Sequence, residues 1–177
     1  MERRRTNVYL IGPMGSGKTT IGQRLASKLQ LEFLDCDREL EEQTGASVSL
    51  IFDVEGEKGF RERETAMLKK LSARDGVLIA TGGGVVATEA IRKRLRESVL
   101  VVYLQTSVDQ QLQRLKRDNS RPLLQTDDRR EKLTRLAEER NPLYEELADI
   151  VFPAQNRAVN AVTASLHEAI CSYWNQI

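Results

Sequence analysis

The sequence predicts an α/β fold, in which a parallel β-sheet is flanked by helices, from three observations. Short apolar runs alternate with longer charged segments of helical spacing, which is typical of βαβ units. Most of the apolar runs lack polar alternation, as expected of strands covered on both faces. The chain has 177 residues, and a domain usually has about 100–200. We therefore expect a single domain that spans residues 1–177.

Five segments are predicted to form the strands. Four of them are apolar and rich in β-branched residues: Val8–Ile11, Val77–Ala80, residues 99–104 and residues 150–152. The fifth, residues 32–36, carries a weaker signal. Consecutive strands separated by helical segments are expected to lie parallel in one sheet.

Helical spacing is clearest in three regions. Apolar residues recur every four positions at Ile21, Leu25 and Leu29, and again at Leu104, Val108 and Leu112, although Lys116 in the second series is polar. One helical face near the end of the chain is marked by Val159, Val162, Leu166, Ala169 and Tyr173. Residues 118–130 interrupt the pattern, and we interpret them as a mobile insertion in the domain.

Composition argues against several classes of protein. The formal net charge is +1, from 27 basic and 26 acidic residues, and the charges are scattered, which argues against disorder, a nucleic-acid-binding tail and a polybasic membrane anchor. We find no stretch near the roughly 18 apolar residues of a membrane span and no signal-peptide pattern. Cys36 and Cys171 form no CxxC pair and are typical of reduced thiols. We expect a cytoplasmic protein with no nucleic-acid or membrane partner.

Residues 12–19, here called the P-loop, read GPMGSGKT and match the pattern GxxxxGK[ST]. They lie between a predicted strand and a predicted helix, which is the context that this motif requires. The glycines allow backbone N–H groups to converge on phosphate oxygens at the start of a helix. Lys18 is expected to reach the β- and γ-phosphates, and the Thr19 hydroxyl to bind Mg²⁺. The P-loop therefore predicts a nucleotide site.

A nucleotide-binding switch or regulatory module is the alternative from another functional class. Residues 53–56 match the short DxxG pattern of GTPases but follow no apolar strand, and no NKxD sequence occurs in the chain. The guanine-reading loop of a GTPase is therefore missing. A small kinase is the favoured interpretation.

Two aspartates end the weak second strand. Residues i and i+2 of a strand point the same way, so Asp35 and Asp37 are predicted to face one cleft at the edge of the sheet. Phosphoryl transfer needs an anion that holds Mg²⁺, assigned to Asp35, and another that orients the attacking hydroxyl, assigned to Asp37. Asp37 could instead cap a helix that begins at Arg38. Cys36 points the opposite way and is expected to be buried.

Arginines and glycines later in the chain indicate an anionic substrate. Glu64 lies three residues after Arg61 on a predicted helix, where it can brace the guanidinium toward a carboxylate, although a solvated ion pair is the alternative. The glycine loop (residues 82–84) follows the third strand, where bare backbone can approach a ligand. Arg121 lies in the insertion, from which a closing loop could bring it to the phosphoryl group. Arg140 is predicted to end a helix just before a proline. Arg121 and Arg140 could instead be ordinary surface arginines.

Together these motifs resemble the shikimate kinase family over nearly the whole chain. The matching segments, in chain order, are residues 12–19, 34–37, 56–57 with 60–61 and 64, 82–84, 121–124 and 140–144. The resemblance implies a five-stranded parallel sheet in the order 2-3-1-4-5, a substrate-binding region at about residues 37–65 and a lid at about 114–130. It also implies transfer of the γ-phosphoryl group of ATP to the 3-hydroxyl of shikimate, in aromatic amino-acid biosynthesis.

The same resemblance implies a role for each site residue. The catalytic groups would be Asp37, Lys18 and Arg121. Shikimate would bind to Asp37, Arg61, Glu64, Gly82, Gly83, Gly84 and Arg140. ATP would bind to Gly15, Ser16, Gly17, Lys18, Thr19, Thr20, Arg114, Arg121 and Arg157, with Arg114 beside the adenine. Thr19 and Asp35 would hold Mg²⁺. We expect a monomer.

Gluconate kinase is the nearest alternative within the superfamily. Its helix after the second strand usually begins with an aspartate followed shortly by His-Pro, whereas Asp37 is followed by Arg38, Glu39 and Leu40. A nucleoside-monophosphate kinase would fit the P-loop but not the later motifs. Shikimate is therefore the preferred substrate, and another small hydroxylated acid such as gluconate is the alternative.

Overall fold

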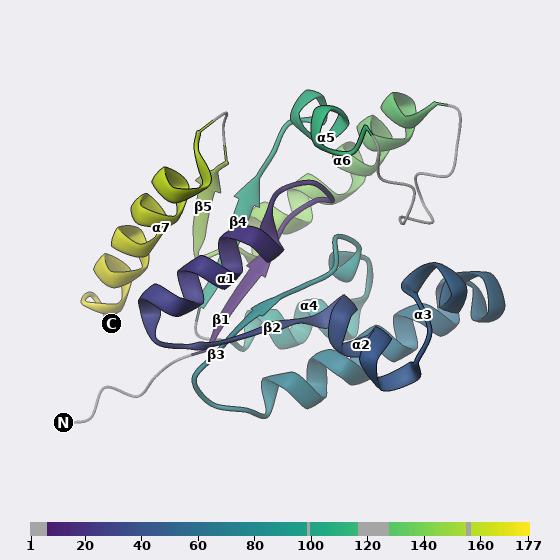
Figure 1. The fold of residues 1–177 in the computed structure, drawn as a ribbon, viewed down its shortest axis with the longest axis horizontal. Helices are drawn as coiled ribbons and strands as arrows, with labels where there is room; N and C mark the ends of the chain where they lie inside the picture. Colours follow the sequence, from purple (N-terminus) through teal and green to yellow (C-terminus); the bar gives the residue numbers. More distant parts are fainter. Residues whose placement is uncertain (1–6, 99, 117–127, 155–156) are drawn as a thin grey trace.

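The computed structural model describes residues 7–98, 100–116, 128–154 and 157–177. Five strands in these ranges form one parallel sheet in the order β2-β3-β1-β4-β5. They are β1 (Val8–Ile11), β2 (Glu32–Asp35), β3 (Val77–Ala80), β4 (Leu100–Gln105) and β5 (Ile150–Pro153). The predicted fold class and strand order are confirmed (Figure 1).

Helices cover both faces of the sheet. On one face lie α1 (Lys18–Leu29) and α7 (Val159–Trp174), which pack against each other (Figure 1). On the other face lie α3 (Val48–Ser72), α4 (Glu89–Arg96) and α6 (Arg129–Leu147). The shorter elements are α2 (Cys36–Thr44), the 3₁₀ turn η1 (Val85–Ala87) and α5 (Val108–Arg114). In the ranges described, no helix is both long and apolar enough to cross a membrane.

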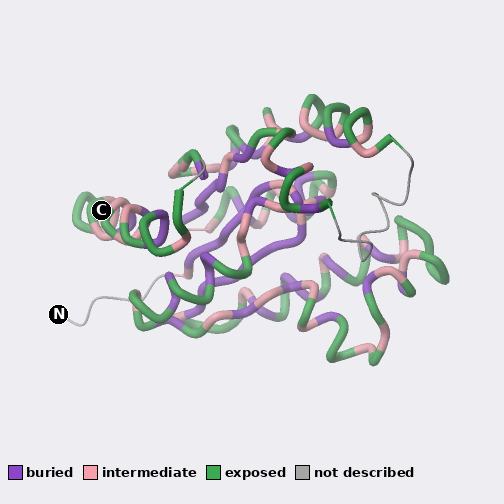
Figure 2. Tube along the Cα trace, turned by 45° about the horizontal axis from the view of Figure 1, so that its top comes forward, coloured by how far each residue is buried: buried purple, intermediate pink, exposed green. Residues whose placement is uncertain are grey.

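The two-sided cover explains why the strands lack polar alternation. In β1, Val8 and Leu10 pack into the core beneath α1 and α7. The alternate residues Tyr9 and Ile11 pack into the core beneath α3, α4 and α6. All four side chains are buried, and exposed residues gather on the outer sides of the helices (Figure 2). Apolar residues are therefore required at every position of this strand.

The parallel arrangement brings the ends of three strands to one edge of the sheet. The P-loop follows β1, Asp35 ends β2, and the glycine loop follows β3 by one residue. In open parallel sheets, ligands bind at this carboxyl edge. The fold therefore gathers the predicted motifs on one side of the molecule.

Two helix boundaries differ from the sequence expectation. Leu104 belongs to β4 and not to the following helix, because its side chain is fully buried between the sheet and the α1–α7 layer. Arg140 does not end a helix, because α6 continues through Pro142 to Leu147. Proline removes one backbone donor, and burial of Tyr144 and Leu147 in the core offsets that loss.

Candidate active site

The P-loop connects β1 to α1 through three glycines with positive φ. Gly12, Gly15 and Gly17 have φ values of 150°, 74° and 88°, which glycine adopts without the steric cost of a Cβ. A Cβ at Gly12 would also lie 2.8 Å from the carbonyl oxygen of Leu104. No side chain caps the N-terminus of α1, since Gly17 is its N-cap. The first N–H groups of this helix therefore face the loop, as phosphate binding requires.

Lys18 and Thr19 both face the space around the P-loop. The Lys18 ammonium donates to the carbonyl oxygens of Gly12 (2.6 Å) and Pro13 (3.0 Å), so it lies across the loop. The Thr19 hydroxyl donates to Asp35 Oδ2 at 2.7 Å. Hydroxyl and carboxylate oxygens are ligands suited to Mg²⁺, which takes its remaining ligands from water and phosphate. The residues predicted to hold the metal therefore fit it.

An open cavity of about 670 Å³ surrounds the P-loop, here called the nucleotide cavity. Gly15, Ser16, Gly17, Lys18, Thr19, Thr20, Asp35 and Arg114 are among the residues that line it. Arg114 donates to the carbonyl oxygen of Gly15 at 2.7 Å. Arg157 does not line this cavity, because its guanidinium bonds to Ser165 Oγ at 2.8 Å. Arg121 and most of the predicted lid lie outside the described residues.

Asp35 and Asp37 do not share a strand, so the argument from strand alternation is wrong. The strand β2 ends at Asp35, and α2 begins at Cys36. The Asp35 carboxylate is the N-cap, and its Oδ1 accepts the N–H groups of Asp37 (3.0 Å) and Arg38 (3.2 Å). An aspartate at this position satisfies backbone donors that the helix cannot. The alternative that Asp37 caps the helix is also wrong, because the cap is Asp35.

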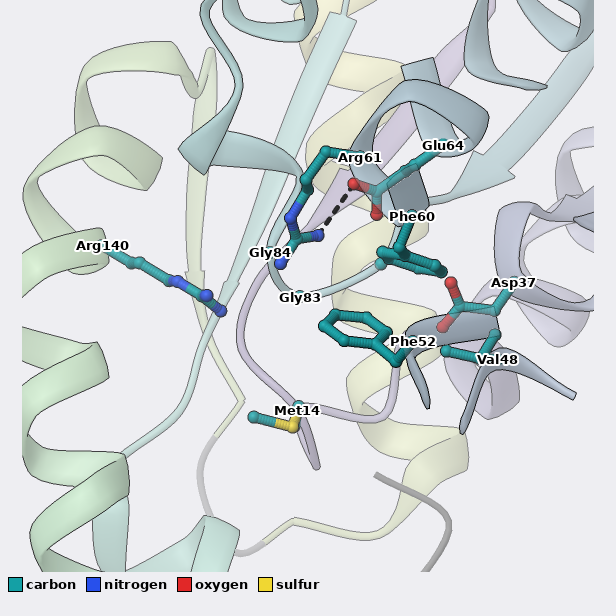
Figure 3. Close-up of a pocket in the computed structure, with 11 residues that line it drawn as sticks. Met14, Asp37, Val48, Phe52, Phe60, Arg61, Glu64, Gly83, Gly84 and Arg140 are labelled. Carbon is teal, nitrogen blue, oxygen red and sulfur yellow. Dashed lines mark hydrogen bonds and ion pairs between the residues drawn. The ribbon is translucent and has the colours of Figure 1, made fainter. Parts of the chain in front are cut away.

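Asp37 lines a second, smaller pocket of about 50 Å³, here called the acceptor pocket. Its lining comes from the P-loop, α2, α3, the glycine loop and α6: Met14, Asp37, Val48, Phe52, Phe60, Arg61, Glu64, Gly82, Gly83, Gly84 and Arg140 (Figure 3). Every predicted substrate-binding residue is in this set. Five of these residues also line the nucleotide cavity, so the two spaces adjoin there: Met14, Asp37, Val48, Gly82 and Gly83.

Four lining residues were not predicted as site residues: Met14, Val48, Phe52 and Phe60. The two phenylalanines lie eight residues apart on α3, yet their ring centroids are 4.5 Å apart. Gly56 explains this contact, because its φ of 72° and ψ of −179° interrupt the helix between them. The sequence offers two glycines between the rings, Gly56 and Gly59, and only Gly56 has a positive φ.

Arg61 is held firmly at one wall of the acceptor pocket. Its Nη1 donates to Glu64 Oε2 at 2.9 Å, and its side chain is only 12% exposed. The guanidinium carbon also lies 5.3 Å from the ring centroid of Phe60 and 6.0 Å from that of Phe52, within the range of cation–π attraction. The alternative of a solvated ion pair is therefore wrong.

Glu64 is almost completely buried beneath this arginine. Burial raises the pKa of Glu64, and the neighbouring Arg61 guanidinium only partly opposes that shift. Within the described residues, Glu64 Oε1 and Arg61 Nε have no hydrogen-bond partner. Buried polar atoms are rarely left unpaired in native proteins, so these two atoms mark a place where a ligand group is expected.

Residues 82–84 must be glycines because other groups lie too close for a Cβ, and not because their backbone has a positive φ. A Cβ on Gly82 would lie 2.7 Å from Glu64 Oε1, and a Cβ on Gly83 would lie 3.2 Å from the backbone nitrogen of Met14. A Cβ on Gly84 would overlap the Arg61 guanidinium. The loop is therefore in contact with α3 on one side and with the P-loop on the other.

Arg140 approaches the same loop from α6. Its guanidinium points toward Gly83 and Gly84 from the side opposite Asp37 (Figure 3). Arg140 is buried, with 9% of its surface exposed. Two guanidinium groups therefore converge on a small pocket that also contains a carboxylate, and this combination suits an acceptor that carries both a carboxylate and a hydroxyl group.

The model of the shikimate kinase family matches residues 14–171. The chain belongs to the shikimate kinase family. A shikimate kinase of Pseudoalteromonas atlantica is 51% identical over 164 residues, which cover 93% of this chain and 96% of that relative. One from Vibrio parahaemolyticus is 53% identical over 156 residues, which cover 88% and 91%.

A solved family member has the same fold. The structure described as shikimate kinase from Acinetobacter baumannii in complex with shikimate superposes with a TM-score of 0.93 at 44% identity, and the match covers 97% of this chain and 96% of that one. Family membership and fold are thus established from both sequence and structure. The roles assigned to individual site residues of this shikimate kinase family member stay predictions.

Proposed function

We propose that this chain transfers the γ-phosphoryl group of ATP to the 3-hydroxyl of shikimate, as a member of the aromatic amino-acid pathway. One observation carries the proposal: Asp37 lies at the junction of the nucleotide cavity and the acceptor pocket. An acceptor hydroxyl beside Asp37 would face the terminal phosphate of a nucleotide on the P-loop. Phosphoryl transfer depends mainly on such positioning and on charge stabilisation.

The acceptor pocket supplies the groups that hold shikimate. Arg61 and Arg140 bind its carboxylate, since a guanidinium fork matches the two oxygens of that group. Phe52 and Phe60 give one wall an apolar surface for the ring carbons. The glycine loop lets its neighbours approach closely, because a Cβ on Gly82, Gly83 or Gly84 would contact Glu64, Met14 or Arg61.

The reaction forms one bond and breaks another. The 3-hydroxyl oxygen bonds to the γ-phosphorus as the bond from that phosphorus to the β,γ-bridging oxygen breaks, and ADP leaves. Asp37 orients the hydroxyl and accepts its proton. Lys18 and the N–H groups at the start of α1 bind the phosphates.

Thr19 and Asp35 are proposed to hold Mg²⁺. When bound, the ion neutralises charge on the β- and γ-phosphates. Arg114 is proposed to lie beside the adenine and Arg121 to reach the phosphates from the lid. Arg157 would reach the adenine only if its guanidinium left Ser165. We also propose that the protein is a monomer and that it is cytoplasmic. The two free cysteines, Cys36 and Cys171, support the cytoplasmic location, because disulfides are rare in that compartment.

ADP release tests the proposal directly. The protein would be assayed with ATP and Mg²⁺ against shikimate, gluconate and a nucleoside monophosphate, one acceptor at a time. We expect ADP release to depend on shikimate alone. Turnover with gluconate would favour the alternative small-acid kinase, and release independent of any acceptor would favour a nucleotide-binding regulatory module.

A further inference from the structure

Tyr144 connects α6 to the glycine loop without lining the acceptor pocket. Its hydroxyl donates to the carbonyl oxygen of Gly83, which lies 61 residues away in the sequence. The residue is 1% exposed, and its ring stacks on Tyr103 of β4, with centroids 5.0 Å apart and an interplanar angle of 26°. Burial raises the pKa of Tyr144, and the neighbouring Arg140 guanidinium only partly opposes that shift, so the hydroxyl keeps its proton and donates it to the Gly83 carbonyl.

This hydrogen bond fixes one peptide of the glycine loop. Among the residues that the structure describes, Tyr144 is the only donor to the Gly83 carbonyl. The peptide that joins Gly83 to Gly84 is planar and trans, so holding its carbonyl also sets the direction of the Gly84 N–H and the place of the Gly84 Cα. Glycine otherwise has the widest conformational freedom of any residue. Without the Tyr144 hydroxyl, the Gly83 carbonyl would lack a partner and the loop would lose this restraint.

The restraint extends to Arg61. The Gly84 Cα lies so close to the Arg61 guanidinium that no Cβ fits between them. A shift of this Cα would either push the guanidinium or leave space beneath it. A guanidinium fork binds a carboxylate with two parallel hydrogen bonds and depends on its direction, so a shift of the loop weakens that contact.

We propose that Tyr144 is a positioning residue for the acceptor. Its hydroxyl fixes the Gly83 carbonyl, and this fixes the position of Gly84, against which the Arg61 guanidinium packs. This inference rests on the proposed function, because it concerns the binding of the shikimate carboxylate. It assigns no contact between Tyr144 and the substrate. The effect should therefore appear in shikimate binding and not in ATP binding.

The chain offers a matched control on the same ring stack. The Tyr103 hydroxyl is buried and has no hydrogen-bond partner in the described part of the chain. Tyr144→Phe and Tyr103→Phe thus each remove one buried hydroxyl from the stacked pair, but only Tyr144→Phe breaks a bond to the glycine loop. Both substitutions keep the rings, so the packing of the core is retained.

Steady-state kinetics and calorimetric titration with shikimate test the proposal. For Tyr144→Phe we expect the KM and Kd of shikimate to rise about tenfold, equivalent to about 1.4 kcal/mol, with the KM of ATP and kcat within about twofold of wild type. Tyr103→Phe should match wild type in all four. In an Arg61→Lys background, Tyr144→Phe should raise the shikimate KM by less than about threefold, because the fork that it positions is already absent.

Several results would overturn the inference. They are an unchanged shikimate KM in Tyr144→Phe, an equal rise in the KM of both substrates, and a full tenfold effect in the Arg61→Lys background. Failure of Tyr144→Phe to fold, judged by thermal unfolding beside Tyr103→Phe, would also contradict it, because the hydroxyl would then serve the fold. Turnover by the wild-type protein separates the proposed function from the role of Tyr144. If the wild type releases no ADP in the presence of shikimate, the proposed function is contradicted, whatever the variants do.

Discussion

Replacement of Gly84 by alanine tests the geometry of the acceptor pocket. The added Cβ would overlap the Arg61 guanidinium, and the guanidinium cannot simply move back because it is held by Glu64 at 2.9 Å and flanked by Phe52 and Phe60. We expect Arg61 to be pushed out of line with the substrate carboxylate. A hydrogen bond to a charged group contributes about 1.5–3 kcal/mol. At about 1.4 kcal/mol per factor of ten, the shikimate KM should rise roughly ten- to a hundredfold.

The assay is shikimate-dependent ADP release, with the KM of each substrate measured at saturation of the other. The KM of ATP should change by less than about twofold, since Arg61 does not line the nucleotide cavity. Gly83→Ala is the comparison, because its Cβ would meet the backbone nitrogen of Met14 in the P-loop at 3.2 Å. That variant should raise the KM of ATP more than Gly84→Ala does. A shikimate KM within twofold of wild type in Gly84→Ala would refute the reasoning.

Three further predictions follow from the same pocket. Asp37→Asn should lower kcat about 10²–10⁴-fold and leave ATP binding intact; near-normal turnover would contradict the role of Asp37 in orienting the hydroxyl. Arg61→Lys should raise the shikimate KM, since a lysine lacks the fork; an unchanged KM would indicate a purely structural ion pair. Burial raises the pKa of Glu64 above its unfolded value near 4.5, so the folded protein holds the Glu64 proton more tightly than the unfolded chain. The contribution of this proton to the free energy of unfolding is complete below that pH and is lost as the pH rises through the folded pKa. Wild-type protein should therefore lose stability relative to Glu64→Gln as the pH rises above the unfolded value near 4.5, as measured by urea unfolding at a series of pH values, and a constant difference would contradict the shift.

Contiguous motifs were predicted well because short stretches of backbone determine them. The P-loop glycines, Lys18 and Thr19 lie on consecutive residues between one strand and one helix, and the structure places them accordingly. Strand positions followed from apolar runs that two helical layers cover. The order of the strands came from the family resemblance and is confirmed.

The aspartate pair shows where local reasoning fails. Both a strand and a helix cap were compatible with the sequence around Asp35, and the outcome depended on where β2 leaves the sheet. Its pairing with β3 ends at Asp35, so the next backbone N–H groups need other acceptors and the Asp35 side chain supplies one. Thr19 and Asp35, the two residues predicted to hold Mg²⁺, nevertheless lie within hydrogen-bond distance of each other at this edge, and their role at the metal stays a prediction.

The sequence by itself determined the family, the parallel sheet and the phosphate-binding loop, because each depends on contiguous residues or on the apolar pattern of single elements. Only the tertiary structure decided that Phe52 meets Phe60 across the bend at Gly56, and that Gly84 lies against Arg61. It also decided that Tyr144 reaches Gly83 from a helix that continues past Pro142. These contacts join residues on different elements or on either side of a bend, so they form only when the parallel strands end at one edge and the helices pack across them.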